Sequence, residues 1–184
     1  MAKLHGIELK SLKTGFGMEC ESATATIYLN GKKLGRYIDR GDGGCASYDF
    51  GTTAVNRAIR DQCGEYRWFK GYPLSEMLDM LAAELCFLKK SESQYRRSWN
   101  KVKHREGDKA VTVRVMGDGR GTVGTMCFSV NADETRDSAT VSRIVKEQVN
   151  CSDMAASDGF EFHVADEPTM EFGEPLHCPN VSMA

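Results

Sequence analysis

Two alternating segments joined at Asn30-Gly31 constrain the fold more than any other feature of the chain. Residues 23–29 alternate apolar with polar side chains, and the segment after the turn continues this alternation. Asn-Gly between two such segments favours a type I′ hairpin, because that turn needs a positive φ at both central residues. Alternation of this kind is typical of a sheet with one face in water. We therefore predict an antiparallel meander from about Leu4 to Ile38.

Two helices are expected after the meander. Residues 52–63 place apolar side chains on one helical face, start at a threonine that can cap a helix, and end before Gly64. Pro73 suits the first turn of a second helix, in which leucines and a methionine recur at helical spacing as far as Leu88. Burial of this stripe makes the second helix a main source of stability. Past Leu88 the charged sequence is expected to continue the helix until Gly107.

A second hairpin, a third helix and a last strand are expected in the second half. Alternating apolar residues at 111–115 and 126–130 flank the glycine-rich segment 117–121. Asn131 or Asp133 can cap a helix that runs through Val149, and residues 160–164 alternate as a strand. The predicted fold class is α+β, with an antiparallel sheet from the meander and the later hairpin. Two or three helices, one of them long and amphipathic, pack against that sheet.

The chain length of 184 residues suits one domain with a substantial core. We expect a single α+β domain over residues 1–166 and an irregular tail, disordered in part, over residues 167–184, where periodicity is lost and prolines recur. No segment approaches the roughly 20 apolar residues of a membrane-spanning helix, and the first residues lack an apolar signal core. Seven cysteines without a C-x-x-C pair are typical of free thiols in a reducing compartment. These features predict a cytoplasmic protein without membrane contact.

Charge is distributed unevenly, although the formal net charge is only -2. Residues 89–109 hold eight basic and three acidic residues, whereas residues 131–184 hold three basic and eleven acidic residues. Tyr95 and Trp99 lie four residues apart among the cations, so they would share one face of a helix. Cationic and aromatic side chains together suit a phosphate backbone or an unstacked base. The candidate binding residues are Lys89, Lys90, Tyr95, Arg96, Arg97, Trp99, Lys101, Lys103 and Arg105.

Plainer interpretations of both charged segments stay open. The basic segment can be a solvated helix end whose Trp99 folds back onto the core, because charge runs are usually solvent faces. The acidic segment can serve solubility alone. Its sharper interpretation is mimicry of a phosphate row that docks on a cationic groove of a nucleic-acid-binding protein.

No motif in the chain names a reaction or a cofactor. Asp39, Asp42 and Asp49 surround a glycine loop and could hold a hard cation, but their spacing differs from that of a calcium loop. Formation of turns is the simpler role for them. His163 and His177 lack partners at zinc-ligand spacing. We therefore expect no cofactor, no metal and no catalytic residue.

The run LKSLKTGFGMECESATATIYLNGKKLGRYIDRGDGGCASYDF, residues 9–50, resembles the start of small proteins encoded by phages and mobile elements of gut bacteria. Some inhibitors of host CRISPR nucleases are small proteins of that kind. The resemblance implies a non-enzymatic inhibitor of a host defence nuclease, such as the type II CRISPR effector. Such an inhibitor acts in the host cytosol by binding the effector or its nucleic acid. The resemblance covers about the first quarter of the chain and implies no functional residues.

Two other interpretations come from the residues themselves. The chain can be a nucleic-acid-binding protein, or a metal-dependent nuclease, that grips its substrate with the basic segment 89–109. A homodimer is also open, because an exposed hairpin edge can pair two subunits by strand addition.

Overall fold

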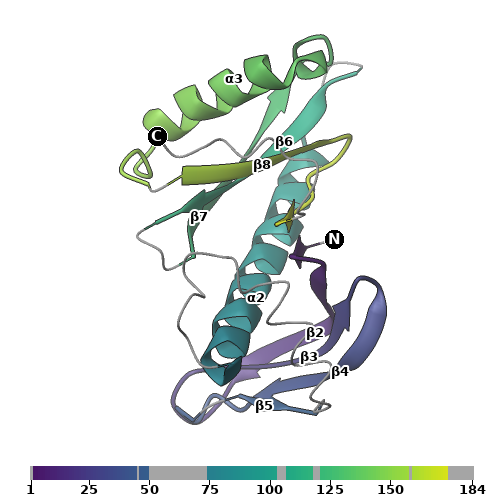
Figure 1. Cartoon of the computed structure of the whole chain (residues 1–184), viewed down its shortest axis with the longest axis vertical. Coiled ribbons are helices and arrows are strands. Elements are labelled where there is room, and N and C mark those ends of the chain that lie inside the picture. The colour runs from purple at the N-terminus through teal and green to yellow at the C-terminus, as the bar shows by residue number, and fades with distance from the viewer. Residues whose placement is uncertain are drawn as a thin grey trace. The chain divides into compact units, whose positions relative to one another are not determined.

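The computed structural model describes residues 2–44, 46–49, 74–102, 107–117, 121–157 and 159–173. Its elements mix helices with antiparallel strands, which confirms the predicted α+β class. In chain order they are β1 (Lys3–Leu4), β2 (Ile7–Phe16), β3 (Glu21–Leu29), β4 (Lys32–Asp39), β5 (Ser47–Tyr48), α2 (Leu74–Trp99), β6 (Lys109–Met116), β7 (Thr122–Val130), the 3-10 helix η1 (Glu134–Arg136), α3 (Ser138–Asn150), β8 (Gly159–Ala165) and β9 (Glu171–Phe172) (Figure 1).

The chain divides into two compact units, one of residues 3–87 and one of residues 88–184 together with the first two residues. Helix α2 passes from the first unit into the second at Leu88. The expected single domain over residues 1–166 stays a prediction, because one continuous helix belongs to both units.

The predicted hairpin at Asn30-Gly31 is present in the first unit. Asn30 and Gly31 have φ values of 48° and 78°, as a type I′ turn requires, and Leu29 pairs with Lys32. Neighbouring strands are antiparallel in the order β5-β4-β3-β2-β1. The meander is therefore confirmed, and the short strands β1 and β5 extend it on both sides.

Helix α2 covers one face of this sheet with its first half. A small cavity is bordered by buried side chains of both layers, namely Ile7, Leu9, Ile27, Leu78, Leu81, Ala82 and Leu85. The hydroxyl of Tyr48 on β5 donates to Asp79 Oδ1 of α2 over 2.7 Å. Burial, followed by this bond, raises the pKa of Tyr48. The prediction that α2 is a core helix is confirmed.

The second unit contains a three-stranded antiparallel sheet in the order β7-β6-β8. The later hairpin therefore forms a sheet of its own with β8, rather than the one sheet with the meander that was predicted. Helix α3 lies along this sheet (Figure 1). Its valines pack with β6 and β8 in one core cluster, whose buried members are Val111, Val113, Val115, Val130, Val141, Val145, Val149 and Phe162. Thr112 and Arg114 point to the opposite face of β6 and are also buried. The central strand β6 is therefore covered on both faces.

Helix α3 begins at a different residue from the one predicted. Asp137 is its N-cap and accepts hydrogen bonds from the backbone N–H groups of Ala139 and Thr140. Asn131 instead accepts from the backbone N–H of Asp133 and starts the turn that leads into η1. The choice of Asn131 or Asp133 as the cap was wrong, because these residues form a separate turn before the helix.

Three other expectations concern the end of α2, a helix over residues 52–63 and the tail after residue 166. Helix α2 ends at Trp99 rather than at Gly107. The helix expected over residues 52–63 lies outside the described residues, as do residues 174–184 of the expected tail. Within residues 167–173 the chain forms β9 and buries Met170 and Phe172.

Candidate nucleic-acid interface

The second half of α2 carries most of the candidate binding residues. No glycine or proline interrupts residues 74–99, and Leu88, Ser91 and Glu92 are buried on one side of the helix. The last turn tightens, because Lys101 N donates to Ser98 O over 3.1 Å. Lys103 and Arg105 lie outside the described residues.

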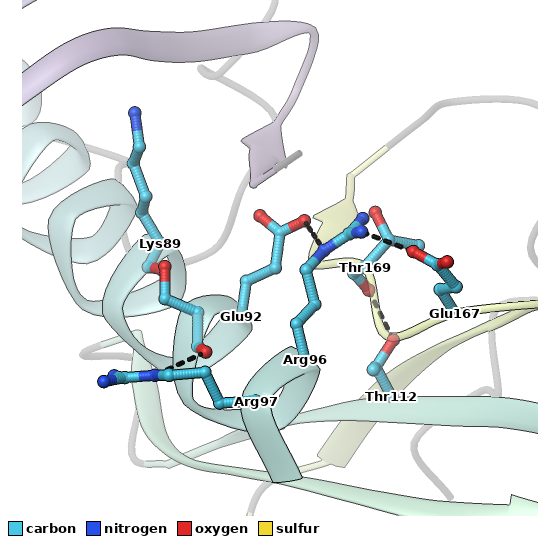
Figure 2. Close-up of polar contacts among 8 residues, drawn as sticks. Lys89, Glu92, Arg96, Arg97, Thr112, Glu167 and Thr169 are labelled. Carbon is cyan, nitrogen blue, oxygen red and sulfur yellow. Dashed lines mark hydrogen bonds and ion pairs between the residues drawn. The ribbon is translucent and has the colours of Figure 1, made fainter. Parts of the chain in front are cut away.

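Arg96 lies in an ion-pair network within the second unit. Its Nε donates to Glu92 Oε1 over 3.1 Å, and its Nη1 donates to Glu167 Oε2 over 2.7 Å. Figure 2 shows the guanidinium of Arg96 between the two carboxylates. The Glu92 side chain is only 8% exposed, so one half of this network is shielded from solvent. Arg96 thus has an internal role that the sequence pattern does not reveal.

The segment after β8 neutralises part of the basic segment. Besides the pair of Arg96 with Glu167, Lys109 pairs with Asp166. The Thr112 hydroxyl also donates to the backbone oxygen of Thr169 (Figure 2). Opposite charges that lie far apart in the sequence therefore meet in the fold. The local excess of positive charge is smaller than the sequence count indicates.

The two aromatic candidates are partly withdrawn from solvent. The Tyr95 hydroxyl donates to the backbone oxygen of Thr125 on β7 over 2.6 Å. Burial raises the pKa of Tyr95 above its ordinary value. Trp99 is half-buried. The hydroxyl of Tyr95 is held by the sheet, which leaves Trp99 as the aromatic candidate of this segment.

The exposed cations form a basic face near the end of α2, which we define as Lys90, Arg97 and Lys101. Lys89, the remaining candidate, is half-buried. Lys90 and Arg97 are seven residues apart, which places them on one side of the helix about 10 Å apart along its axis. Arg97 donates from Nε to its own helix at Ser93 O, and Figure 2 shows its guanidinium on the side away from Arg96 and Glu167. Arg97 and Lys101 are therefore the cations best placed to meet an external anion.

The aspartates of the glycine loop form turns. Asp39 Oδ1 accepts from Gly41 N over 2.9 Å, and Asp42 Oδ1 accepts from Gly44 N over 3.1 Å. Gly41 has a φ of 65°, which glycine adopts at little cost. Within the described part of the chain, no three His, Cys, Asp or Glu side chains gather as metal ligands would. The turn interpretation of Asp39 and Asp42 is confirmed.

Sequence reasoning missed a buried ion pair on the central strand of the second sheet. Arg114 is completely buried, and its Nη1 donates to Glu161 Oε2 over 2.9 Å. Its Nε donates to the Thr122 hydroxyl over 2.8 Å. Arg114 and Glu161 stand directly opposite each other in the register of β6 and β8. Once these strands are aligned, a basic and an acidic residue at facing positions indicate the ion pair.

By its fold the chain is a mixed α+β protein, and the exposed cations of the basic face lie near the end of its long helix. No family model, curated protein or solved structure matches the chain. In the part of the chain that the structure describes, no helix combines the length and the apolar character that crossing a membrane requires.

Proposed function

We propose that the chain is a non-enzymatic inhibitor of a host defence nuclease, such as the type II CRISPR effector, and that it binds the nucleic acid of that effector. One observation carries the proposal, namely the exposed position of Arg97 and Lys101 at the end of α2. Arg96 and Lys109, in contrast, form ion pairs with acidic side chains of the same unit. Arg97 and Lys101 are therefore exposed, whereas Arg96 and Lys109 are paired with carboxylates.

Nucleic acid is the partner that suits these cations. Arginine and lysine bind phosphate oxygens, and the release of condensed counterions drives such binding. The guanidinium of Arg97 offers its two terminal nitrogens, because only Nε bonds its own helix. Half-buried Trp99 lies between the two exposed cations in the sequence and can add contact with an unstacked base.

The resemblance of residues 9–50 to phage and mobile-element proteins supports the inhibitory part of the proposal. An effector that depends on a guide strand and a target strand is blocked when a second protein occupies either strand. Binding without catalysis is enough for this effect. The chain then acts on the guide or the target and leaves both intact.

The first experiment measures binding to labelled single-stranded and duplex DNA and RNA at two salt concentrations. We expect the R97E/K101E variant to bind more weakly than the wild type at low salt. The slope of log affinity against log salt should fall in magnitude by about 1.4–1.8, because each lost phosphate contact contributes about 0.7–0.9. The matched control is K32E/K146E, which makes the same charge change at exposed residues of β4 and α3.

The second experiment measures target cleavage by a purified type II effector with its guide RNA. The wild type and K32E/K146E should inhibit cleavage, and R97E/K101E should inhibit much less. Equal inhibition by all three proteins contradicts the assigned face. Nucleic-acid binding without inhibition favours a nucleic-acid-binding protein with another role, and cleavage by the chain itself with added Mg²⁺ favours a nuclease.

A further inference from the structure

Two large apolar side chains are exposed at the end of β2 and in the turn that follows it. Phe16 is 97% exposed and Met18 is 92% exposed. Single exposed apolar residues are common on protein surfaces, but here two large ones lie only two residues apart in the chain. We call residues 16–21, with the supporting loop 40–44, the apolar tip.

The backbone of the apolar tip is fixed by the supporting loop. Glu19 N and Cys20 N both donate to Gly41 O, over 2.8 and 3.1 Å, and Gly17 N donates to Cys20 O over 2.8 Å. A Cβ at Gly17 would lie 2.2 Å from Arg40 O, and one at Gly41 would lie 2.4 Å from Cys20 O. The two segments therefore pack backbone to backbone. A turn held in this way loses little conformational entropy when its side chains enter a pocket.

The exposed charged side chains of the apolar tip are mostly acidic. The tip contains Glu19, Glu21 and Asp42 against one cation, Arg40, and all four are exposed. The Glu19 carboxylate lies over Gly43, where a Cβ would come within 2.4 Å of Oε2. A surface of this kind complements an apolar pocket with cationic groups around it.

We propose that the apolar tip docks on the protein part of the nuclease effector, with Phe16 and Met18 in an apolar pocket and cationic side chains around it. The choice of partner rests on the proposed function, and the acidic rim supports it because the effector's nucleic-acid channel is positively charged. Anionic lipid headgroups would repel the rim. A second copy of the chain would bring two acidic rims together, which is unfavourable for the same reason.

The test measures binding of the chain to a purified type II effector without guide RNA, so that nucleic acid does not contribute. F16S/M18S should bind at least about tenfold more weakly than the wild type, because aromatic and apolar anchors dominate interfaces of this kind. E19Q/D42N should bind more weakly at low salt and approach the wild type at high salt. The control V123S, at an exposed apolar residue of β7, should bind as the wild type does.

Equal binding by F16S/M18S and the wild type overturns the inference. If the chain inhibits cleavage and binds nucleic acid but does not bind the bare effector, only the docking inference is overturned. If the chain neither binds nor inhibits, the proposed function is overturned as well. Two results of sedimentation experiments would also overturn the inference. One is a dimer of the wild type that is absent in F16S/M18S. The other is binding of the wild type, but not of F16S/M18S, to vesicles of phosphatidylserine and phosphatidylcholine.

Discussion

Arg96 and Arg97 are adjacent in the sequence but have different surroundings. Arg96 bridges Glu92 and Glu167, whereas Arg97 contacts the backbone of its own helix. We expect R96A to lower the free energy of unfolding by about 1–2 kcal/mol. This is less than the loss of a fully buried pair, because the Arg96 side chain is 40% exposed. R97A should stay within about 0.5 kcal/mol of the wild type. Urea denaturation with a common slope measures both values.

The same two variants should differ in the opposite direction in nucleic-acid binding. R97A should weaken binding, and R96A should leave it near the wild-type value. A loss of stability in R97A equal to that in R96A would contradict the division of roles. The sequence predicts one half of the Arg96 network, because Glu92 lies four residues earlier on the helix. It cannot predict Glu167, which lies 71 residues away and meets Arg96 only in the folded chain.

Asp137 controls the start of α3 at the scale of a single element. It accepts hydrogen bonds from Ala139 N, Thr140 N and the Thr140 hydroxyl. The bond from the Thr140 hydroxyl, followed by those from the backbone, lowers the pKa of Asp137. A lowered pKa in the folded state stabilises the fold above the ordinary aspartate pKa, and this contribution disappears as the pH falls through the lowered value.

We therefore expect D137A to lower the melting temperature at pH 7. The difference from the wild type should shrink as the pH falls from the ordinary aspartate pKa through the lowered one, because the carboxylate is protonated first in the unfolded and then in the folded wild type. Thermal unfolding across this pH range measures the effect. D133A is the control, since the Asp133 side chain makes no capping hydrogen bond. A difference that stays constant down to the lowest pH would contradict the role of the ionised carboxylate.

The elements that the sequence predicts are those with strong local signals. Asn30-Gly31 specifies its turn through two positive φ values, and the leucines of α2 specify a buried helical face. The short strands β5 and β9 have two residues each, which is too few to show a period. The cap of α3 was missed because Asn131, Asp133 and Asp137 all have the chemistry of a cap. Only the path of the chain through η1 decides among them.

Charge at the scale of the whole molecule differs from charge along the sequence. The basic segment 89–109 and the acidic segment 131–184 are separate in the chain, but ion pairs join them at Arg96 and Lys109. Local counting therefore overestimates the cationic surface. The basic face was predicted in part, since Arg97 and Lys101 are exposed and Arg96 is neutralised. The apolar tip was not predicted, because a phenylalanine and a methionine in a strand pattern indicate burial rather than exposure.

Each compact unit has a core of its own, and this leads to a prediction about the whole chain. Leu81 is 3% exposed in the core of the first unit, whereas the valine cluster of β6 and α3 belongs to the second. L81D places an unpaired charge in the first core, which costs several kcal/mol. We expect the amides of β2, β3 and β4 to lose protection in hydrogen exchange, and those of β6 and β8 to keep it. The control is A83D at an exposed position of the same helix, which should keep protection in both units. Equal loss of protection in β6 and β8 would instead support one cooperative domain over residues 1–166, because local opening follows cooperative units.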